Sequence, residues 1–324
     1  MQSVETYREA FIDYLKSQPL EREPKNLYQP IDYILNLGGK RLRPVLVLMA
    51  CEAFRGHFKD ALPAAMAIEV FHNFSLVHDD IMDDAPLRRG KHTVHEKWDV
   101  NTGILSGDAM LINAYQYLES YEGETLKKLL TLFSKTAVEV CEGQQYDVDF
   151  ETRTDVTISE YLKMIEYKTS VLVAAALKMG AIIAGTTSEN EELIYEFGRN
   201  LGIAFQLQDD YLDAFGDPKT FGKQVGGDII ENKKTFLYLK ALELSQETTQ
   251  KKLSELFKVK PENPSTKIEL AKTIFQESGS VKALKSEIQN YTNKAFAKLL
   301  KIDANADEKS VFRQFGEQLM KRNS

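Results

Sequence analysis

Apolar residues recur with the period of an α-helix along most of the chain. Residues 63–84, PAAMAIEVFHNFSLVHDDIMDD, begin with proline, contain no glycine and stop before a second proline, which predicts a long helix. Residues 191–218 follow the same pattern and end in Gly-Asp-Pro. Residues 159–185 are apolar on nearly all sides, which predicts a helix inside a hydrophobic core.

Patterns typical of β-strands are nearly absent. Residues 42–54, LRPVLVLMACEAF, suit either a strand or a helix, and the helical pattern around them favours a helix. Residues 260–267, KPENPSTK, predict a loop. No repeat or linker divides the chain. We therefore predict one all-α domain over residues 1–324, built of roughly ten helices.

Composition narrows the classes of function. The chain has 324 residues, of which 43% are hydrophobic, enough for a large core. Its formal net charge is −7, which disfavours nucleic acid as a partner. Two cysteines are too few for a disulfide scaffold. The charged N-terminus does not resemble a secretory signal, and no apolar run reaches the ~20 residues of a membrane helix. We expect a cytoplasmic protein without stable membrane insertion.

Two acidic segments are the first sign of chemistry. The first contains Asp79, Asp80, Asp83 and Asp84, and the second contains Asp209, Asp210 and Asp213. Side chains four residues apart lie about 40° apart around a helix, so the carboxylates repel unless a cation lies between them. A solvated helix end would explain one such segment, but both follow apolar sequence, where unpaired carboxylates are costly. Mg²⁺, which prefers oxygen ligands shared with phosphates, fits both segments.

Three basic segments complete this pattern. They are GGKRLRP at 38–44, LRRGK at 87–91 and FGKQVGGDIIENKKT at 221–235. Glycine-rich loops with lysine and arginine commonly bind phosphate oxygens. Each segment alone is explained equally well by an ordinary basic surface. Two of them lie next to acidic segments in the sequence, which favours a magnesium and diphosphate site.

With these motifs the chain resembles the trans-isoprenyl diphosphate synthases, the polyprenyl synthetase family, of the short-chain geranylgeranyl or farnesyl type. The resemblance covers roughly residues 30–240 and rests on GGKRLRP, LVHDDIMDDAPLRRG, IEYKTS, FQLQDDYLD and FGKQVGGDIIENKKT, in that order. It implies a helical bundle of the isoprenoid synthase type around a central cavity, and a homodimer. His92 stands where the family commonly has proline, and Asp84 extends the first acidic segment.

The resemblance also implies a role for each matching residue. About three Mg²⁺ ions would bridge an allylic diphosphate to Asp79, Asp83 and Asp209, supported by Asp80 and Asp213. The same diphosphate would be held by Arg88, Lys168, Lys223 and Lys233. The second substrate, isopentenyl diphosphate, would bind to Lys40, Arg43, His72 and Arg89. An allylic cation would be stabilised by Lys168, Thr169 and Gln206. Gln144 and Asp147 would support these groups, or form a surface polar pair.

Product length would depend on the side chains below the first acidic segment. Ser75 lies four residues before Asp79, nearly under it. Phe74 and Phe71 lie about 140° and about 80° around an ideal helix from Asp79, where they would flank a tunnel for the growing prenyl chain. An aromatic residue five before the first aspartate resembles short-chain enzymes. We predict a product of about twenty carbons, with fifteen next; alternatively, Phe74 only packs between helices.

Other classes of protein share part of this pattern. A class I terpene cyclase has one such acidic segment, but it would not need GGKRLRP and His72 for a second diphosphate. A non-catalytic regulatory subunit of a prenyl synthase would bind diphosphates, but such subunits typically lose one acidic segment. His92 and His95 have a spacing that suits zinc, but a zinc site needs further ligands nearby.

Overall fold

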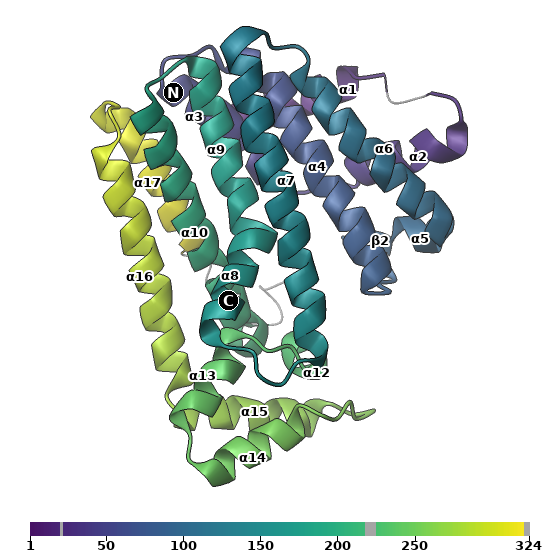
Figure 1. Ribbon diagram of the computed structural model, residues 1–324, viewed down its shortest axis with the longest axis vertical. Coiled ribbons are helices and arrows are strands. Elements are labelled where there is room, and N and C mark those ends of the chain that lie inside the picture. Colours follow the sequence, from purple (N-terminus) through teal and green to yellow (C-terminus); the bar gives the residue numbers. More distant parts are fainter. Residues whose placement is uncertain (20–21, 218–224, 321–324) are drawn as a thin grey trace. The chain divides into compact units, whose positions relative to one another are not determined.

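Helices form almost all of the regular structure in this computed structural model, which describes residues 1–19, 22–217 and 225–320 (Figure 1). Among the described residues the only strands are β1 (Leu87–Arg88) and β2 (Lys91–His92), which pair antiparallel in a short hairpin. The expected all-α class is therefore confirmed.

The chain divides into two compact units. The first comprises Met1–Lys135 and Ala175–Glu192, and the second comprises Thr136–Ala174 and Leu193–Ser324. Three long helices contribute residues to both units: α7 (Gly123–Thr152), α9 (Val171–Ala184) and α10 (Ser188–Phe215). The helix predicted over 191–218 is α10, which starts three residues earlier and ends before Gly216. A single domain over the whole chain stays a prediction.

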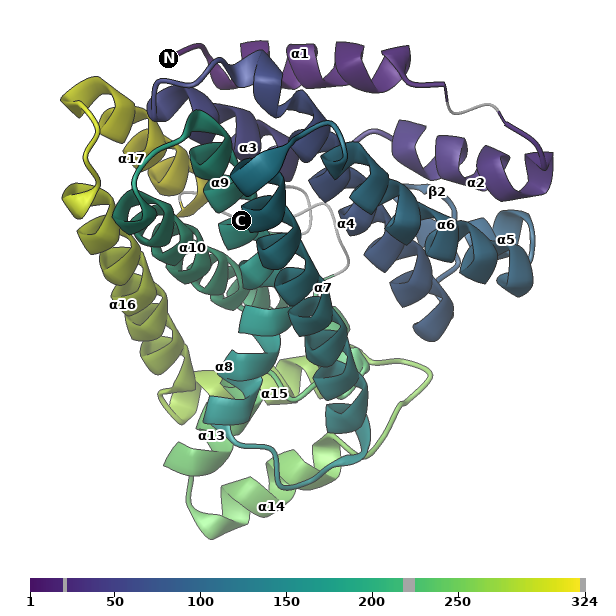
Figure 2. The ribbon, with the colours of Figure 1, turned by 45° about the horizontal axis from the view of Figure 1, so that its top comes forward.

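The first unit is built around α4, the helix predicted over 63–84. Its other elements are α1 (Val4–Ser17), α2 (Lys25–Asn36), α3 (Leu42–Ala53), a 3₁₀ turn (Phe58–Ala61), α5 (Val94–Lys97) and α6 (Val100–Leu118). α4 (Leu62–Met82) begins with proline in its first turn and lies along α6 (Figure 2). Gly107 permits this close packing, because a Cβ atom there would lie 2.2 Å from His78 Nε2. The prediction of a helix over 42–54 is also confirmed, by α3.

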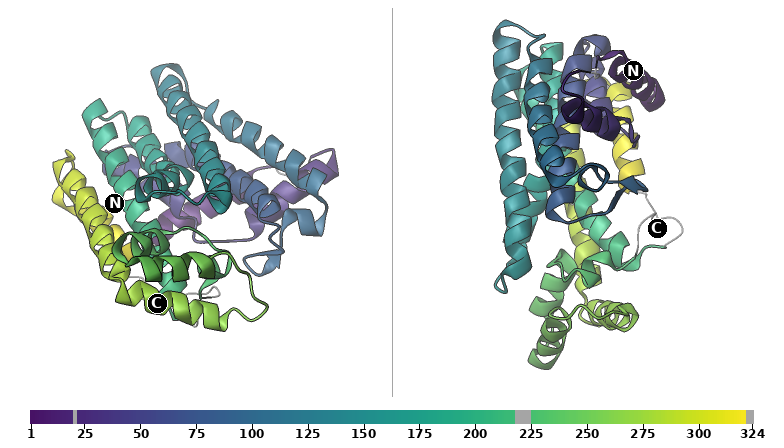
Figure 3. Two further views of the ribbon diagram at one scale, coloured as in Figure 1. Left: turned by 60° about the horizontal axis from the view of Figure 1, so that its bottom comes forward. Right: turned by 90° about the vertical axis from the view of Figure 1, so that its right-hand side faces the viewer.

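The second unit has its own hydrophobic core. Its further helices are α8 (Ile158–Ile165), α12 (Gly227–Ile230), α13 (Phe236–Leu244), α14 (Glu247–Leu256), α15 (Ser265–Glu277), α16 (Ser280–Lys301) and α17 (Ala306–Met320). α13, α14 and α15 gather at one end of α16 (Figure 3). The loop predicted over 260–267 ends earlier, because Asn263 Oδ1 accepts a hydrogen bond from the Ser265 N–H at 3.1 Å and α15 begins there.

The helix predicted over 159–185 is interrupted. A π-helical turn, Glu166–Ser170, lies between α8 and α9 and contains Lys168 and Thr169. Gly143 lets α7 approach this turn, because a Cβ atom there would lie 2.2 Å from the Lys168 backbone nitrogen. The whole stretch, Ile158–Ala184, is long and apolar enough to cross a membrane, but 61% of its most hydrophobic window is buried inside the protein. It therefore has the properties of a core helix.

Candidate active site

The first acidic segment lies where α4 ends. Asp83 follows the last residue of the helix, and its N–H donates to the Asp79 carbonyl at 2.9 Å, so one helical turn still joins the two residues. Asp79 and Asp83 therefore remain on adjacent turns, as predicted. Their carboxylate oxygens are the donor type that Mg²⁺ prefers.

Arg88 in the hairpin binds the first acidic segment. Its Nε and Nη2 atoms donate to the two oxygens of Asp80 at 2.7 and 2.6 Å, and Nη2 lies 3.9 Å from Asp79 Oδ2. Burial raises the pKa of Asp80, and the bonds from Arg88 offset this only in part. Burial also acts to lower the pKa of Arg88, but Asp80, Asp79 and Asp83 raise it above its usual value. Arg88 is therefore the bidentate cationic partner of Asp80.

The glycine pair of GGKRLRP builds a second cationic cluster in the first unit. Gly38 and Gly39 have φ of 82° and 119°, and Arg89 donates to the Gly38 carbonyl. A side chain at Gly39 would collide with the Arg89 guanidinium, whose atoms lie 2.8–2.9 Å from the Cβ position. Arg43 Nη1 lies 3.0 Å from His72 Nε2, and the buried Arg43 Nε has no hydrogen-bond partner among the described residues.

This second cluster suits an anion such as a diphosphate. Burial lowers the pKa of both Arg43 and Arg89, and neighbouring positive charges add to this: Arg89 lowers the pKa of Arg43, and Arg41 and Arg88 lower that of Arg89. A bound anion would remove this repulsion. Lys40 is exposed beside the glycine pair. Arg41 serves the fold instead, because its buried guanidinium binds Glu69 and the Leu35 carbonyl.

The charge of His72 gives a prediction for stability. Burial lowers its pKa well below the usual value, and Arg43, Arg89 and further arginines add to this. Below pH ~6.5 the unfolded chain therefore binds a proton that the folded chain does not. As the pH drops, His72 should therefore lower the free energy of unfolding by up to about 1.4 kcal/mol per pH unit. Urea unfolding between pH 7 and 5 should show a shallower fall in His72→Gln; an unchanged slope would refute this assignment.

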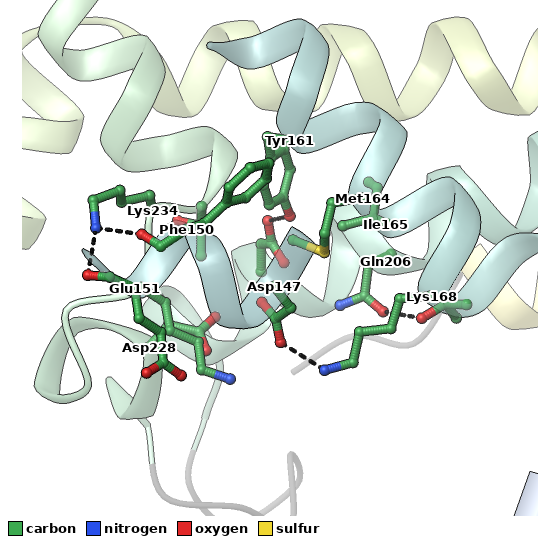
Figure 4. A pocket seen from close by; sticks show the side chains of 14 residues that line it. Asp147, Phe150, Glu151, Tyr161, Met164, Ile165, Lys168, Gln206, Asp228 and Lys234 are labelled. Atoms are coloured by element: carbon green, nitrogen blue, oxygen red, sulfur yellow. Dashed lines mark hydrogen bonds and ion pairs between the residues drawn. The ribbon is translucent and has the colours of Figure 1, made fainter. Parts of the chain in front are cut away.

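In the second unit, polar side chains line a pocket of about 120 Å³. Lys168, Thr169 and Gln206, predicted as a group, all line it, and so do Asp147 and Lys233. Figure 4 shows Lys168, Gln206 and Asp147 around this pocket. Lys168 Nζ donates to Asp147 Oδ2 at 2.6 Å, and Thr169 Oγ1 lies 3.4 Å from Gln206 Oε1. The pocket therefore presents lysine ammonium groups together with several oxygen dipoles to a ligand.

The wall of this pocket contains a carboxyl group, that of Asp210, whose burial could not be predicted from the sequence. Asp210 is 5% exposed and accepts a hydrogen bond from the Tyr161 hydroxyl. Burial raises the pKa of Asp210 well above its usual value, and the charges of Asp228 and Asp209 raise it further. The sequence around Tyr161 predicts only a buried core residue. The packing of α8 on α10 brings its hydroxyl to Asp210.

The second acidic segment holds the glycine turn before α12. Asp213 Oδ2 accepts from the Asp228 N–H at 3.0 Å, and the Asp213 carbonyl accepts from the Gly226 N–H at 2.6 Å. Lys234 donates to the carbonyls of Phe150 and Glu151 at 2.6 and 3.0 Å, where α7 ends. These contacts fix both sides of Lys233. Lys223, also predicted to bind diphosphate, lies outside the described residues.

Lys267 anchors the same loop from α15. It is 3% exposed, and its ammonium donates to Val259 O at 2.9 Å, Ile230 O at 3.2 Å and Asn232 Oδ1 at 2.5 Å.

Lys267→Met would leave three acceptors unpaired, so we expect the free energy of unfolding to fall by about 1–3 kcal/mol. Because the anchored turn precedes Lys233, KM for a diphosphate ligand should rise. Lys282→Met, at an exposed position of α16, is the control; equal stability and KM in both variants would contradict the anchoring role.

The residues predicted to set product length lie in an aromatic cluster. The rings of Phe71 and Phe74 are 5.4 Å apart between centroids, and Phe74 lies 4.9 Å from the His78 ring. Phe133 and Tyr115 extend the cluster from α7 and α6, and neither was predicted. Ser75 donates to the His72 carbonyl at 2.9 Å. Phe71 and Phe74 lie on the part of α4 that precedes Asp79.

Comparisons with known proteins show the family of the chain. A model of the polyprenyl synthetase family matches residues 24–274. The geranylgeranyl diphosphate synthase of Methanosarcina mazei is 46% identical over 222 residues, 68% of each chain. A crystal structure of a geranylgeranyl pyrophosphate synthase has a TM-score of 0.96 and 54% identity over 100% of both chains. That of the Corynebacterium glutamicum enzyme, complexed with isoprenyl diphosphate and magnesium, has a TM-score of 0.87 and 26% identity, covering 99% of this chain and 98% of that one.

The fold and these matches define the class of protein: the chain is a prenyltransferase with an all-α fold. It belongs to the polyprenyl synthetase family, as its ordered motifs indicated.

Proposed function

We propose that this chain condenses isopentenyl diphosphate head-to-tail with allylic diphosphates and releases a product of about twenty carbons. The observation that carries the proposal is the presence of both acidic segments and both cationic groups, each with side chains suited to a diphosphate. Relatives named geranylgeranyl diphosphate synthase support the product length. Phe74, a bulky residue just before the first acidic segment, supports it as well.

The two cationic groups would take different diphosphates. Arg43, Arg89 and His72, with Lys40 nearby, would bind the diphosphate of isopentenyl diphosphate. The pKa of His72 is low, so its imidazole would act as a neutral hydrogen-bond partner there. Arg88, Lys168 and Lys233 would bind the allylic diphosphate, joined by Lys223. Charge-assisted hydrogen bonds from these groups are the strong kind that phosphate oxygens accept.

The reaction would begin when the allylic carbon–oxygen bond breaks and the diphosphate leaves with the electron pair. Lys168 and Arg88 would stabilise the negative charge that develops on it. The remaining allylic cation would be attacked by the double bond of isopentenyl diphosphate, which forms the new carbon–carbon bond. Thr169 and Gln206 would direct oxygen dipoles at the cation. A proton lost to the released diphosphate then restores a neutral, longer allylic chain.

Divalent metal use is suggested by the relatives crystallised with magnesium or calcium and isoprenyl diphosphate. The donor set of this chain fits Mg²⁺, because Asp79, Asp83 and Asp209 offer only carboxylate oxygens. We propose that these residues hold about three Mg²⁺ ions with a bound allylic diphosphate, supported by Asp80 and Asp213. When bound, Mg²⁺ neutralises charge on the leaving group.

We also propose that the chain is a homodimer, and exposed apolar side chains on α6 support this proposal. Ile104, Leu105 and Ile112 on this helix are 40%, 59% and 59% exposed, an unusual cluster of apolar side chains on one helix. Ile112→Asp should therefore convert a species of twice the chain mass into a monomer in analytical ultracentrifugation. Gln116→Asp, an exposed polar position on the same helix, is the control. A monomeric native chain would end this part of the proposal.

We propose that the ligands of the chain are isopentenyl diphosphate and allylic diphosphates. We propose no nucleic-acid partner and no stable insertion into a membrane. We propose a cytoplasmic location. Among the described residues, one stretch is long and apolar enough to span a membrane, and it has the properties of a core helix.

Phosphorus NMR of a mixture with Mg²⁺ tests which substrates are consumed. We expect inorganic diphosphate to appear only when isopentenyl diphosphate and an allylic diphosphate are both present. Release from the allylic diphosphate alone would instead identify a terpene cyclase. Binding of both diphosphates with no release would identify a regulatory subunit.

A further inference from the structure

Three potential metal ligands lie in the first unit at the end of the first acidic segment, and the proposed function gives them no role. Asp84, His95 and Glu96 each offer one ligand atom, and these atoms lie within 4.8 Å of one another. Asp84 closes the first acidic segment with a left-handed backbone, φ 49°. His95 and Glu96 are consecutive residues of the short helix α5.

His95 distinguishes this group from an ordinary acidic surface. Its side chain is 8% exposed, and both ring nitrogens lack a hydrogen-bond partner among the described residues. Buried polar atoms are nearly always paired, so an unpaired imidazole indicates a missing partner. Asp80 binds Arg88 with both of its oxygens and forms no hydrogen bond with the imidazole. The buried imidazole therefore lies beside two exposed carboxylates, those of Asp84 and Glu96.

We propose that Asp84, His95 and Glu96 bind one divalent transition-metal ion of the zinc type, separate from the magnesium sites. One imidazole nitrogen and two carboxylate oxygens, with a water molecule as fourth ligand, suit Zn²⁺, whereas Mg²⁺ prefers oxygen alone. Ligand atoms about 2.1 Å from a tetrahedral ion lie about 3.4 Å apart. The carboxylates of Asp84 and Glu96 are exposed and reach this spacing by side-chain rotation, while the buried imidazole stays in place.

Such an ion would stabilise the arginine-bearing hairpin. Asp84 lies before the hairpin and His95 after it, so the ion would close residues 85–94 into a loop that contains Arg88 and Arg89. The Thr93 N–H already donates to the Pro86 carbonyl at 3.2 Å across the base of this loop. A ligand that binds only the folded state raises its stability. The ion would therefore hold Arg88 and Arg89 in position without touching either substrate.

Calorimetric titration of the full chain with Zn²⁺, in saturating Mg²⁺, tests this site. We expect one equivalent of Zn²⁺ to bind and to raise the melting temperature. Asp84→Asn and Glu96→Gln should each weaken binding at least about tenfold, and His95→Gln should abolish it. Asn tolerates the left-handed backbone of Asp84, so that variant keeps its fold. His92→Gln, an exposed position on β2 of the same hairpin, should bind Zn²⁺ as the native chain does.

Two results would overturn the proposal. One is a native chain that takes up no Zn²⁺ when Mg²⁺ is present. The other is Zn²⁺ binding that all three variants keep, since the ion would then lie on the magnesium ligands. The readouts are binding and melting temperature, so they stand whether or not the chain condenses prenyl diphosphates. Because Asp84 and Glu96 are exposed, two of the variants leave the buried packing unchanged.

Discussion

Replacement of Asp79 or Asp209 by asparagine is expected to lower the rate of condensation roughly a thousandfold. Each change removes a negative oxygen ligand from a proposed Mg²⁺ site, and the loss falls on the step in which the diphosphate leaves. Without Mg²⁺ the same changes remove repulsion between neighbouring carboxylates. We therefore expect the melting temperature of the metal-free variants to equal or exceed that of the native chain, while Mg²⁺ with diphosphate no longer raises it.

Asp13→Asn, at an exposed position of α1, is the matched control, and it should keep native activity. Initial rates with saturating substrates and a thermal unfolding series with and without Mg²⁺ give both readouts. An Asp79→Asn or Asp209→Asn variant that keeps more than about a tenth of the native rate would show that the carboxylate is not a required ligand.

Phe74→Ala is expected to lengthen the product by at least one five-carbon unit. Phe74 is 8% exposed, and its ring packs 5.4 Å from Phe71 and 4.9 Å from His78, measured between ring centroids. Removal of the ring opens space below the first acidic segment, where the growing chain would end. The same change costs about 3–5 kcal/mol of stability, so product chains should be analysed by mass spectrometry well below the melting temperature.

The control for this loss of stability is Phe275→Ala. Phe275 is 1% exposed in the core of the second unit, so its removal costs a similar amount without touching the aromatic cluster. It should yield the native product. Native product from Phe74→Ala as well would favour the alternative that Phe74 only packs between helices.

The helices that carry the acidic segments could be predicted from sequence because their signals are local. Pro63 at the start of α4 and the apolar period through residue 82 determine that helix. The spacing of Asp79 and Asp83, and of Asp209 and Asp213, follows from the same period. The glycine pair before Arg43 predicted a glycine-rich loop, and in the structure both glycines have positive φ.

The contacts that the sequence did not reveal are those between distant elements. The π-helical turn at Lys168 depends on the close approach of Gly143 on α7, which lies 25 residues earlier in the sequence. Tyr161 fits an apolar pattern in the sequence, and only packing makes it a hydrogen-bond partner of Asp210. Lys267 fits a surface pattern, and only packing makes it an anchor for α12. The pairing of Arg88 with Asp80 likewise depends on the hairpin, whose strands are two residues long.

The most direct test of this account is to incubate the native chain with Mg²⁺, isopentenyl diphosphate and one allylic diphosphate of five, ten or fifteen carbons, and to measure product length by mass spectrometry. We predict that every primer that is accepted is extended in five-carbon steps to about twenty carbons. A product far longer than this would contradict the role of the aromatic cluster, and failure to add any five-carbon unit would contradict the proposed condensation itself.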